Sequence, residues 1–313
     1  MSSPVPVHPD APAWFGRNLA VPFTDEVVDV AGCPIHFLAW GEPGRRGLVF
    51  VHGGGAHAHW WTHIAAAFAD EYRVVAVDLS GHGDSGPRDV YRFEQWTDEV
   101  IAVAAAADID GLPVIVGHSM GGFVTIATAA LHPEMVSGVV IVDSPVTEPD
   151  PEVEASRLKE AFGRSRTYAS VDEALLRFRT VPPQERYLPY VMDHVGRRSL
   201  RPVSDTDTDT DDDGGVRWKF DPTVFAQFGG SIRGVALPYL RRIVARFALL
   251  RCENGLVTRD IGEFMNAELG RVAAVVELPE AGHHPMLDEP LVLLTALRAL
   301  LADWDHSEPH RRR

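Results

Sequence analysis

The stretch Gly117-His118-Ser119-Met120-Gly121-Gly122 decides the fold, because it joins two apolar segments through a serine between glycines. The segment before it, 113–116, is typical of a buried strand, and residues 120–131 have the length and composition of a helix. A G-x-S-x-G sequence between a strand and a helix holds its serine on a tight turn with the hydroxyl exposed. Ser119 is therefore a candidate nucleophile.

Short apolar runs alternate with helical stretches on both sides of this motif, which favours a sheet with helices on its faces. A hairpin opens the chain. The predicted strands are 26–30, 35–39, 47–51, 73–77, 113–116, 138–142, 246–250 and 272–277, and the predicted helices are 60–69, 93–107, 120–131, 261–269 and 291–304. The pattern predicts the α/β class, with a mostly parallel eight-stranded sheet flanked by helices.

The alternation of strands and helices stops between residues 146 and 235. This segment is rich in charge and proline, and we expect helices at 151–162 and 171–179. It is too long for an ordinary loop of a compact domain. We therefore expect a core domain formed by 1–145 and 236–313, with 146–235 inserted as a mainly helical lid.

Within the insert, residues 205–213 alternate aspartate with threonine and end in three aspartates. An EF-hand register starting at Asp209 puts Gly214 at position 6, but position 12 is then Phe220 where a bidentate glutamate is needed. We expect a solvated acidic loop. Its six aspartates supply -6 of the formal net charge of -15.

Composition excludes several classes of protein. Acidic residues number 44 against 29 basic ones, and such a surface repels nucleic acids and anionic membranes. The two cysteines, Cys33 and Cys252, are too few for a disulfide framework or a zinc cluster, so no metal is expected. The first residues do not resemble a signal peptide, and no run is long enough to span a membrane. A cytoplasmic location is expected.

A serine hydroxyl needs a neighbouring base, and the stretch 281–290, AGHHPMLDEP, offers one. His283 follows the last predicted strand, so it falls at the carboxyl edge of the sheet, as Ser119 does. His283 is the predicted base. His284 is expected to pack beside it.

Donors for an oxyanion are predicted from His52-Gly53-Gly54-Gly55, which follows a buried strand. The backbone N–H groups of Gly54 and Met120 are the expected donors. Four histidines occur close together here, His52, His57, His59 and His63. No acidic or cysteine ligand is arranged with them, so packing is expected rather than metal binding.

These motifs together resemble the α/β-hydrolase superfamily, in its lid-bearing serine branch. They are HGGG at 52–55, DLSGHGDS at 78–85, GHSMGG at 117–122 and GHHPMLDEP at 282–290, in the order of that family. The resemblance implies Ser119 as nucleophile, His283 as base, and Gly54 and Met120 as oxyanion donors.

One position departs from the family pattern. Most relatives carry the acid of the triad as an aspartate in the loop after the strand that follows the lid, but residues 251–258 read RCENGLVT. Three carboxylates compete for this role. Asp143, at the end of strand 138–142, is the predicted acid, Glu253 is the alternative, and Asp260 is the least favoured.

The resemblance implies that epoxide hydrolases and haloalkane dehalogenases of this superfamily carry an aspartate at the nucleophile position. Ser119 at that position therefore argues against these two reactions. We expect a cofactor-free hydrolase of carboxylic esters acting on a small-molecule acyl substrate. A lyase, cyclase, transferase or C–C bond hydrolase on the same site is the alternative, and a binding protein on this fold is less favoured. Trp60, Trp61 and Trp218 are expected to line an apolar pocket. The sequence leaves the oligomeric state open.

Overall fold

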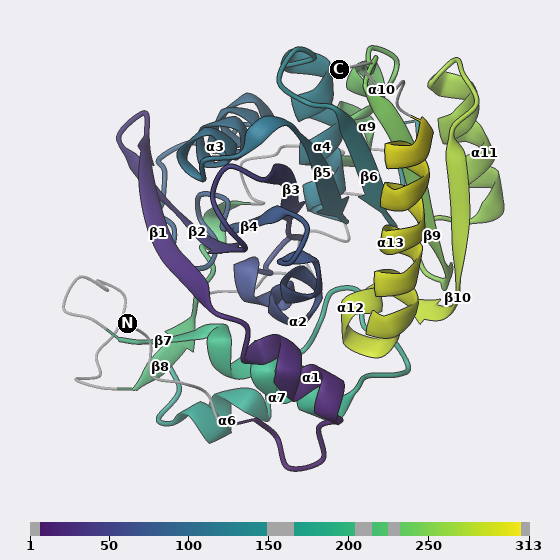
Figure 1. The fold of residues 1–313 in the computed structure, drawn as a ribbon. Helices are drawn as coiled ribbons and strands as arrows, with labels where there is room; N and C mark the ends of the chain where they lie inside the picture. Colours follow the sequence, from purple (N-terminus) through teal and green to yellow (C-terminus); the bar gives the residue numbers. More distant parts are fainter. Residues whose placement is uncertain (1–6, 149–165, 204–214, 225–231, 308–313) are drawn as a thin grey trace.

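The computed structural model describes residues 7–148, 166–203, 215–224 and 232–307, and an eight-stranded sheet forms its centre (Figure 1). The strand order is β1-β2-β4-β3-β5-β6-β9-β10. The antiparallel pairs are β1 with β2 and β2 with β4, and the other neighbours are parallel. The strands are β1 (Phe23–Val30), β2 (Cys33–Trp40), β3 (Arg46–Val51), β4 (Arg73–Val77), β5 (Asp110–His118), β6 (Gly138–Val142), β9 (Arg246–Asn254) and β10 (Ala274–Gly282). The predicted α/β class and mostly parallel eight-stranded sheet are confirmed.

Both faces of the sheet are covered, which explains why its central strands are apolar throughout. Along β3, Val49 and Val51 belong to one core cluster, and Leu48 and Phe50 belong to the cluster on the opposite face. The first cluster is covered by α3 (Phe93–Ala106), α4 (Met120–Leu131), α10 (Leu237–Leu240) and α11 (Arg259–Glu268). The second is covered by α1 (Ala13–Leu19), α2 (Thr62–Ala65), α12 (Pro285–Asp288) and α13 (Pro290–Ser307).

One predicted helix differs from the structure, and one short helix was not predicted. The helix predicted at 60–69 is divided into η1 (Ala58–Trp60), α2 and η2 (Ala66–Phe68), and all residues from 58 to 66 are buried. Because this run is buried on all sides, its apolar residues do not recur with the period of an amphipathic helix. The sequence pattern therefore does not distinguish one continuous helix from several packed turns. Helix α1 was not predicted. Its Phe15 is fully buried against Tyr190 and His63, so tertiary contacts hold this short helix.

The chain between β6 and β9 contains α6 (Val171–Leu175), α7 (Pro189–Arg198), α9 (Ile232–Val235) and α10, as well as an antiparallel pair, β7 (Leu200–Pro202) and β8 (Val216–Trp218). The insert was expected to be mainly helical, and the β7–β8 hairpin was not predicted. The helix expected at 171–179 is shorter, and the expectations for 151–162 and 205–213 lie outside the described residues. The division into a core and a lid at 146–235 stays a prediction.

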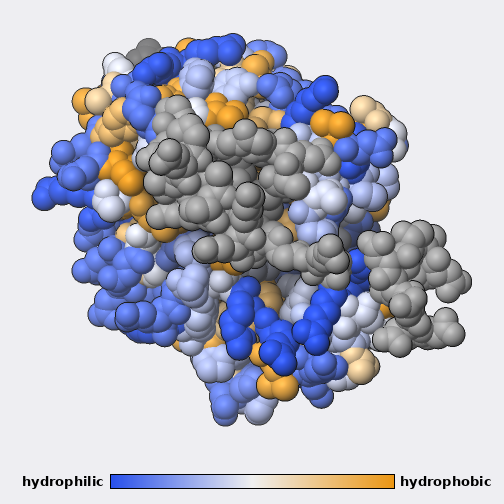
Figure 2. Space-filling model, turned by 180° about the vertical axis from the view of Figure 1, so that it is seen from behind, coloured by the Kyte–Doolittle hydropathy of each residue, from blue (hydrophilic) through white to orange (hydrophobic). Residues whose placement is uncertain are grey.

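Hydrophilic residues predominate on the face of the molecule seen in Figure 2, and hydrophobic residues there are scattered or in small groups. Large exposed apolar side chains such as Leu176, Val244 and Val272 come from separate parts of the chain. In the four ranges given above, no helix combines the length and the hydropathy that crossing a membrane requires.

Close packing around the Ser119 turn makes Gly121 sensitive to substitution. A Cβ atom at Gly121 would lie 2.3 Å from the carbonyl oxygen of His52 and 2.4 Å from that of Val51, both of them backbone atoms. We expect Gly121→Ala to lower the free energy of unfolding by roughly 3 kcal/mol, measured by urea denaturation. Gly262→Ala is the control, because its Cβ would meet only Leu249 at 3.7 Å and alanine favours the helix. A Gly121→Ala protein as stable as the wild type would contradict this packing.

Candidate active site

Ser119 lies between β5 and α4, in a backbone conformation that is rare for a residue with a side chain. Its φ is 53° and its ψ is -120°. The turn is held by a hydrogen bond from the N–H of Ser119 to the carbonyl of Val142, at 3.1 Å. Strain of this kind costs energy and persists only where the surrounding structure enforces it. The turn leaves Ser119 partly exposed at the carboxyl edge of the sheet.

His283 lies between Ser119 and Asp143 and forms a hydrogen bond with each. Its Nε2 is 3.0 Å from the hydroxyl of Ser119, and its Nδ1 is 2.7 Å from Oδ2 of Asp143. His283 and Asp143 are 2% and 0% exposed, so this polar pair is shielded from water. Because the carboxylate accepts the proton at Nδ1, Nε2 presents its lone pair to the serine. The arrangement can remove a proton from the hydroxyl of Ser119.

Asp143 directly follows β6, with a φ of 46°. Besides His283, its carboxylate accepts hydrogen bonds from the backbone amides of Cys252, Leu256 and Val257, at 3.2, 2.7 and 3.1 Å. Burial by itself would raise the pKa of Asp143, but the hydrogen bond and positive charge of His283, together with the amides, hold this pKa below its ordinary value. The carboxylate therefore stays ionised next to the imidazole.

The other two carboxylates considered from the sequence do not contact His283. Glu253 is exposed and accepts a hydrogen bond from the backbone N–H of Glu280 at 2.7 Å. Asp260 is exposed in the first turn of α11. The end of β9 and the loop after it thus present no carboxylate to His283, and they instead donate backbone amides to Asp143. Gly255 belongs to this loop, and a Cβ atom there would lie 2.3 Å from Oδ2 of Asp143.

Residues from the insert and from the serine turn hold the loop of His283. His118 donates from Nε2 to the carbonyl of His283 at 2.7 Å. Gln184, between α6 and α7, accepts from the N–H of His284 at 2.8 Å. The ring of His284 packs against those of His283 and His118, and its Nε2 is 3.2 Å from the carbonyl of Pro182. The sequence analysis did not identify His118 or Gln184 as residues that hold the loop of His283. The position of His118 beside Ser119 in the serine motif is the one sequence signal that pointed to the site.

The glycine-rich loop after β3 lies against the serine. A Cβ atom added at Gly53 would be 3.2 Å from Cβ of Ser119, so this loop passes close to the serine and leaves no room for a side chain there. Gly54 is the next residue and is only partly buried. Met120 is the first residue of α4, and its N–H has no partner within that helix. Both predicted oxyanion donors therefore belong to segments that meet at Ser119.

The three tryptophans expected to line a pocket occupy different places. Trp60 is 5% exposed, and its ring lies 5.6 Å from that of His284. Trp218 stacks on Phe178 at 5.4 Å and lines a cavity described below. Trp61 is fully buried in the core cluster that contains Phe50, and its place in an apolar substrate pocket stays a prediction. Its ring packs against Phe50 on the face of the sheet covered by the second core cluster.

Two groups of described residues bring three possible metal ligands within 4.8 Å of one another. They are His118, His283 and His284, and His36, Asp78 and Asp84. Within them His283 already bonds Asp143 and Ser119, and His36 bonds Asp78 and Asp25. The expectation of a protein without a metal stays a prediction.

Several buried histidines have lowered pKa values because burial disfavours their charged form. The pKa is about 3 for His57, His118 and His194, and about 4 for His63. His36 is the opposite case: burial would lower its pKa, but the hydrogen bond and charge of Asp78 raise it to about 9.

These shifts predict how stability depends on pH. Between about pH 6.5 and 4 the unfolded chain binds more protons at these histidines than the folded protein does. Each buried histidine therefore lowers the free energy of unfolding by up to about 1.4 kcal/mol for every unit by which the pH falls. The stabilisation from protonated His36 is full below 6.5 and is lost as the pH rises through about 9. We expect the Tm to fall from pH 6.5 to 4.5. His194→Gln should flatten this slope relative to His306→Gln, at an exposed position. A constant Tm over this range would contradict burial of neutral histidines.

Comparison with known proteins places these features in a family. A model described as the alpha/beta hydrolase family matches residues 48–296. An esterase of Mycobacterium tuberculosis, Esterase Rv0045c, is 35% identical over 119 residues, which are 38% of this chain and 39% of the relative. A pimeloyl-[acyl-carrier protein] methyl ester esterase of Edwardsiella ictaluri is 36% identical over 101 residues, which are 32% of this chain and 37% of the relative.

Among solved structures, E-2-(acetamidomethylene)succinate hydrolase has a TM-score of 0.74 and 21% sequence identity, over 90% of this chain and 100% of that chain. At this identity the likeness concerns the fold. The sequence matches span 39% and 37% of the lengths of the two curated esterases.

Proposed function

Since the chain belongs to the alpha/beta hydrolase family, we propose that it is a cofactor-free serine hydrolase of carboxylic esters with Ser119, His283 and Asp143 as its catalytic triad. The observation that carries the proposal is the continuous hydrogen-bond path from the Ser119 hydroxyl through His283 to Asp143. Esterases among the similar proteins support the ester class. The substrate is a small-molecule acyl compound.

In the first half of the reaction, His283 Nε2 takes the proton of the Ser119 hydroxyl while Oγ attacks the carbonyl carbon of the ester. The negative charge that develops on the carbonyl oxygen is stabilised by the N–H groups of Gly54 and Met120. Collapse of the tetrahedral intermediate breaks the bond to the alcohol oxygen. His283 returns its proton to the departing alcohol, and the acyl group stays on Ser119.

In the second half, water enters the place of the alcohol, and His283 removes a proton from it as the water oxygen attacks the acyl carbon. The bond between Oγ of Ser119 and the acyl carbon then breaks, His283 returns the proton to Oγ, and the carboxylic acid leaves. Asp143 remains ionised throughout, holds Nδ1–H of the imidazole, and stabilises the imidazolium of each step. The three backbone amides on this carboxylate keep it in position for that task.

The proposal is tested with p-nitrophenyl acetate and butyrate and with a fluorophosphonate label. The wild type should release p-nitrophenol from both esters and should incorporate one label at Ser119, identified by peptide mass spectrometry. Fluorophosphonate incorporation at Ser119 without p-nitrophenol release would show that the serine is activated but would refute ester hydrolysis. It would favour C–C bond hydrolysis, lyase or transferase chemistry instead. Absence of both would refute the serine hydrolase.

A further inference from the structure

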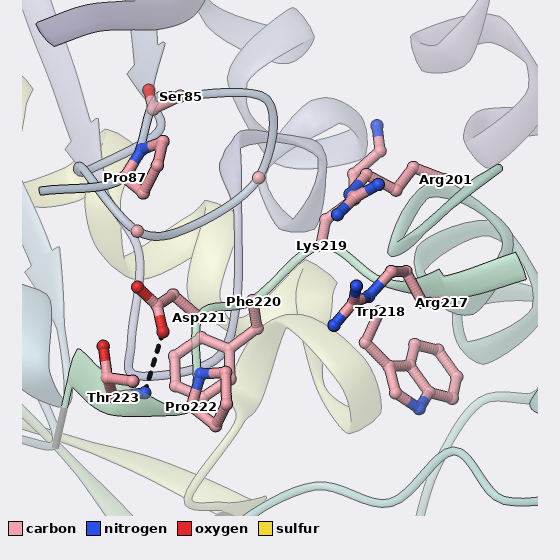
Figure 3. A pocket seen from close by; sticks show the side chains of 12 residues that line it. Ser85, Pro87, Arg201, Arg217, Trp218, Lys219, Phe220, Asp221, Pro222 and Thr223 are labelled. Atoms are coloured by element: carbon pink, nitrogen blue, oxygen red, sulfur yellow. Dashed lines mark hydrogen bonds between the residues drawn. The ribbon is translucent and has the colours of Figure 1, made fainter. Parts of the chain in front are cut away.

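Two contacts of the insert with the rest of the protein differ in what they hold, and the first lies beside a cavity of about 690 Å³. One wall of the cavity is formed by Arg201 and 217–223 of the insert, and the other contains Gly81, Gly83, Ser85 and Pro87 (Figure 3). The N–H of Gly83 donates to the carbonyl of Lys219 at 2.9 Å, which fixes the end of the β7–β8 hairpin. The lining of the cavity does not contain Ser119, Asp143 or His283.

The second contact joins the segment between α6 and α7 to the loop of His283. The N–H of His284 donates to Oε1 of Gln184 at 2.8 Å. Further along the same two segments, the N–H of Leu188 donates to the carbonyl of Leu287 at 2.8 Å. Unlike the hairpin contact, this one is made directly with the loop that carries the proposed base.

Three successive residues, from the one before His283 to the one after it, each have a backbone polar group bound by a side chain. The N–H of Gly282 donates to Oδ2 of Asp288 at 2.6 Å. The carbonyl of His283 accepts from Nε2 of His118 at 2.7 Å, and the N–H of the next residue donates to Gln184. Asp288 belongs to α12 and His118 to β5, so Gln184 is the member of this set that comes from the insert. Together these bonds determine where the loop places the imidazole.

The amide of Gln184 is itself held in place. Its Nε2 donates to the carbonyl of Arg186 at 2.9 Å, so its Oε1 is the atom that faces the N–H of His284. Its backbone N–H donates to the hydroxyl of Tyr187 at 2.9 Å. A Cβ atom added at Gly282 would be 2.9 Å from this Oε1, so the amide passes close to the residue before the base and leaves no room for a side chain there. Gln184 is thus a preorganised acceptor for the loop.

The position of the imidazole decides whether it can move a proton. Its Nε2 is 3.0 Å from the hydroxyl of Ser119 and its Nδ1 is 2.7 Å from Asp143, and proton transfer needs both distances to stay within hydrogen-bond range. His283 lies in the turn between β10 and α12 rather than inside either element, so the side chains that hold this turn supply precision that a loop by itself lacks. A displacement of about 1 Å at a catalytic group can cost roughly 100-fold in rate.

We propose that Gln184 is a positioning residue for the catalytic base, and that through it the insert contributes to ester hydrolysis by holding the loop of His283. Gln184 acts through the backbone beside the imidazole and exchanges no proton itself. Arg186 also joins the two segments, through ion pairs with Glu280 at 2.7 Å and Glu289 at 3.1 Å, but its side chain is 59% exposed and exposed ion pairs contribute little. The inference rests on the proposed serine hydrolase, because it assigns a role toward the base of that triad.

The test replaces Gln184 with methionine, which has a similar size but lacks the amide. With p-nitrophenyl butyrate, kcat of Gln184→Met should fall roughly 10-fold to 100-fold while KM stays within about threefold, because the base is misaligned and substrate binding is not. The rate of fluorophosphonate labelling at Ser119 should fall by a similar factor. Arg186→Gln is the matched control, since it removes the two exposed ion pairs between the same segments, and its kcat should stay within about twofold. All rates are measured well below the Tm of each variant.

Proton NMR supplies a readout that needs no substrate. The proton on Nδ1 of His283, shared with Asp143 in a short hydrogen bond, should give a far-downfield resonance in the wild type that is absent from Asp143→Asn. This proton should exchange with water several-fold faster in Gln184→Met and at the wild-type rate in Arg186→Gln. If the wild type released no p-nitrophenol, the proposed function would fail, and the resonance would still report whether Gln184 positions the imidazole.

A second variant guards against misfolding of the first. Gln184→Asn keeps an amide but is one methylene too short to reach the N–H of His284, so it should show the same loss and takes the place of Gln184→Met if that protein does not fold. The proposal is overturned by a kcat within twofold of the wild type in the folded variant, by a loss that falls on KM alone, by an equal loss in Arg186→Gln, or by an unchanged exchange rate of the His283 proton.

Discussion

Replacing Ser119 with alanine is expected to lower kcat for p-nitrophenyl butyrate by roughly 10⁴-fold to 10⁶-fold, with KM changed by less than about threefold. The hydroxyl is the group that forms the acyl bond, so the variant is left with only the oxyanion donors and bound water. Alanine removes a partly exposed oxygen and leaves the turn unchanged in shape. The Tm should therefore stay within a few degrees of the wild type, and fluorophosphonate incorporation should disappear.

A double variant, Ser119→Ala/His283→Ala, tests whether the two residues act together. His283→Ala alone should lose about as much activity as Ser119→Ala, and the two together should lose little more, because the base acts only through the serine. Initial rates measured with active-site titration of the wild type supply the comparison. Residual turnover of Ser119→Ala at a tenth of the wild-type kcat, free of contaminating esterase, would show that another residue attacks the ester.

Asp143→Asn is expected to lower kcat about 10⁴-fold, since an amide in place of the carboxylate favours the imidazole tautomer that points a proton at the serine. The same substitution weakens the hydrogen bonds to the amides of Cys252, Leu256 and Val257, so part of the change appears as lower stability. Steady-state kinetics at several pH values, below the Tm of the variant, separate the two effects. If the variant is unfolded, it has no melting transition. If the imidazole tautomer is the cause, the variant melts as a folded protein but reacts slowly with the fluorophosphonate.

Glu253→Gln is the matched control, because Glu253 lies at the end of β9, beside the position where the family resemblance implied the acid of the triad. It is exposed and contacts the backbone of Glu280 rather than His283. Its kcat should stay within about twofold of the wild type. If Glu253→Gln lost activity and Asp143→Asn kept it, the assignment of the orienting acid would have to be reversed.

Much of the fold could be predicted because its signals are local. Buried parallel strands such as 47–51 and 138–142 are apolar at every position, and the glycines around Ser119 match a turn that tolerates few other residues. The helix at 60–69 and the missed helix α1 show the limit. Their conformation depends on neighbours distant in sequence, such as Tyr190 against Phe15, which no local pattern reports.

By itself the sequence determined the class of fold, the order of its strands along the chain, and the serine and histidine at the edge where parallel strands end. These follow from hydrophobic period and turn chemistry, which act over a few residues. Only the tertiary structure shows that Asp143 is the carboxylate in contact with His283. Asp143 and residues 252–257 are more than a hundred residues apart and meet through the pairing of β6 with β9. The cavity at Arg201 and Arg217 likewise exists only where the hairpin is folded against the core.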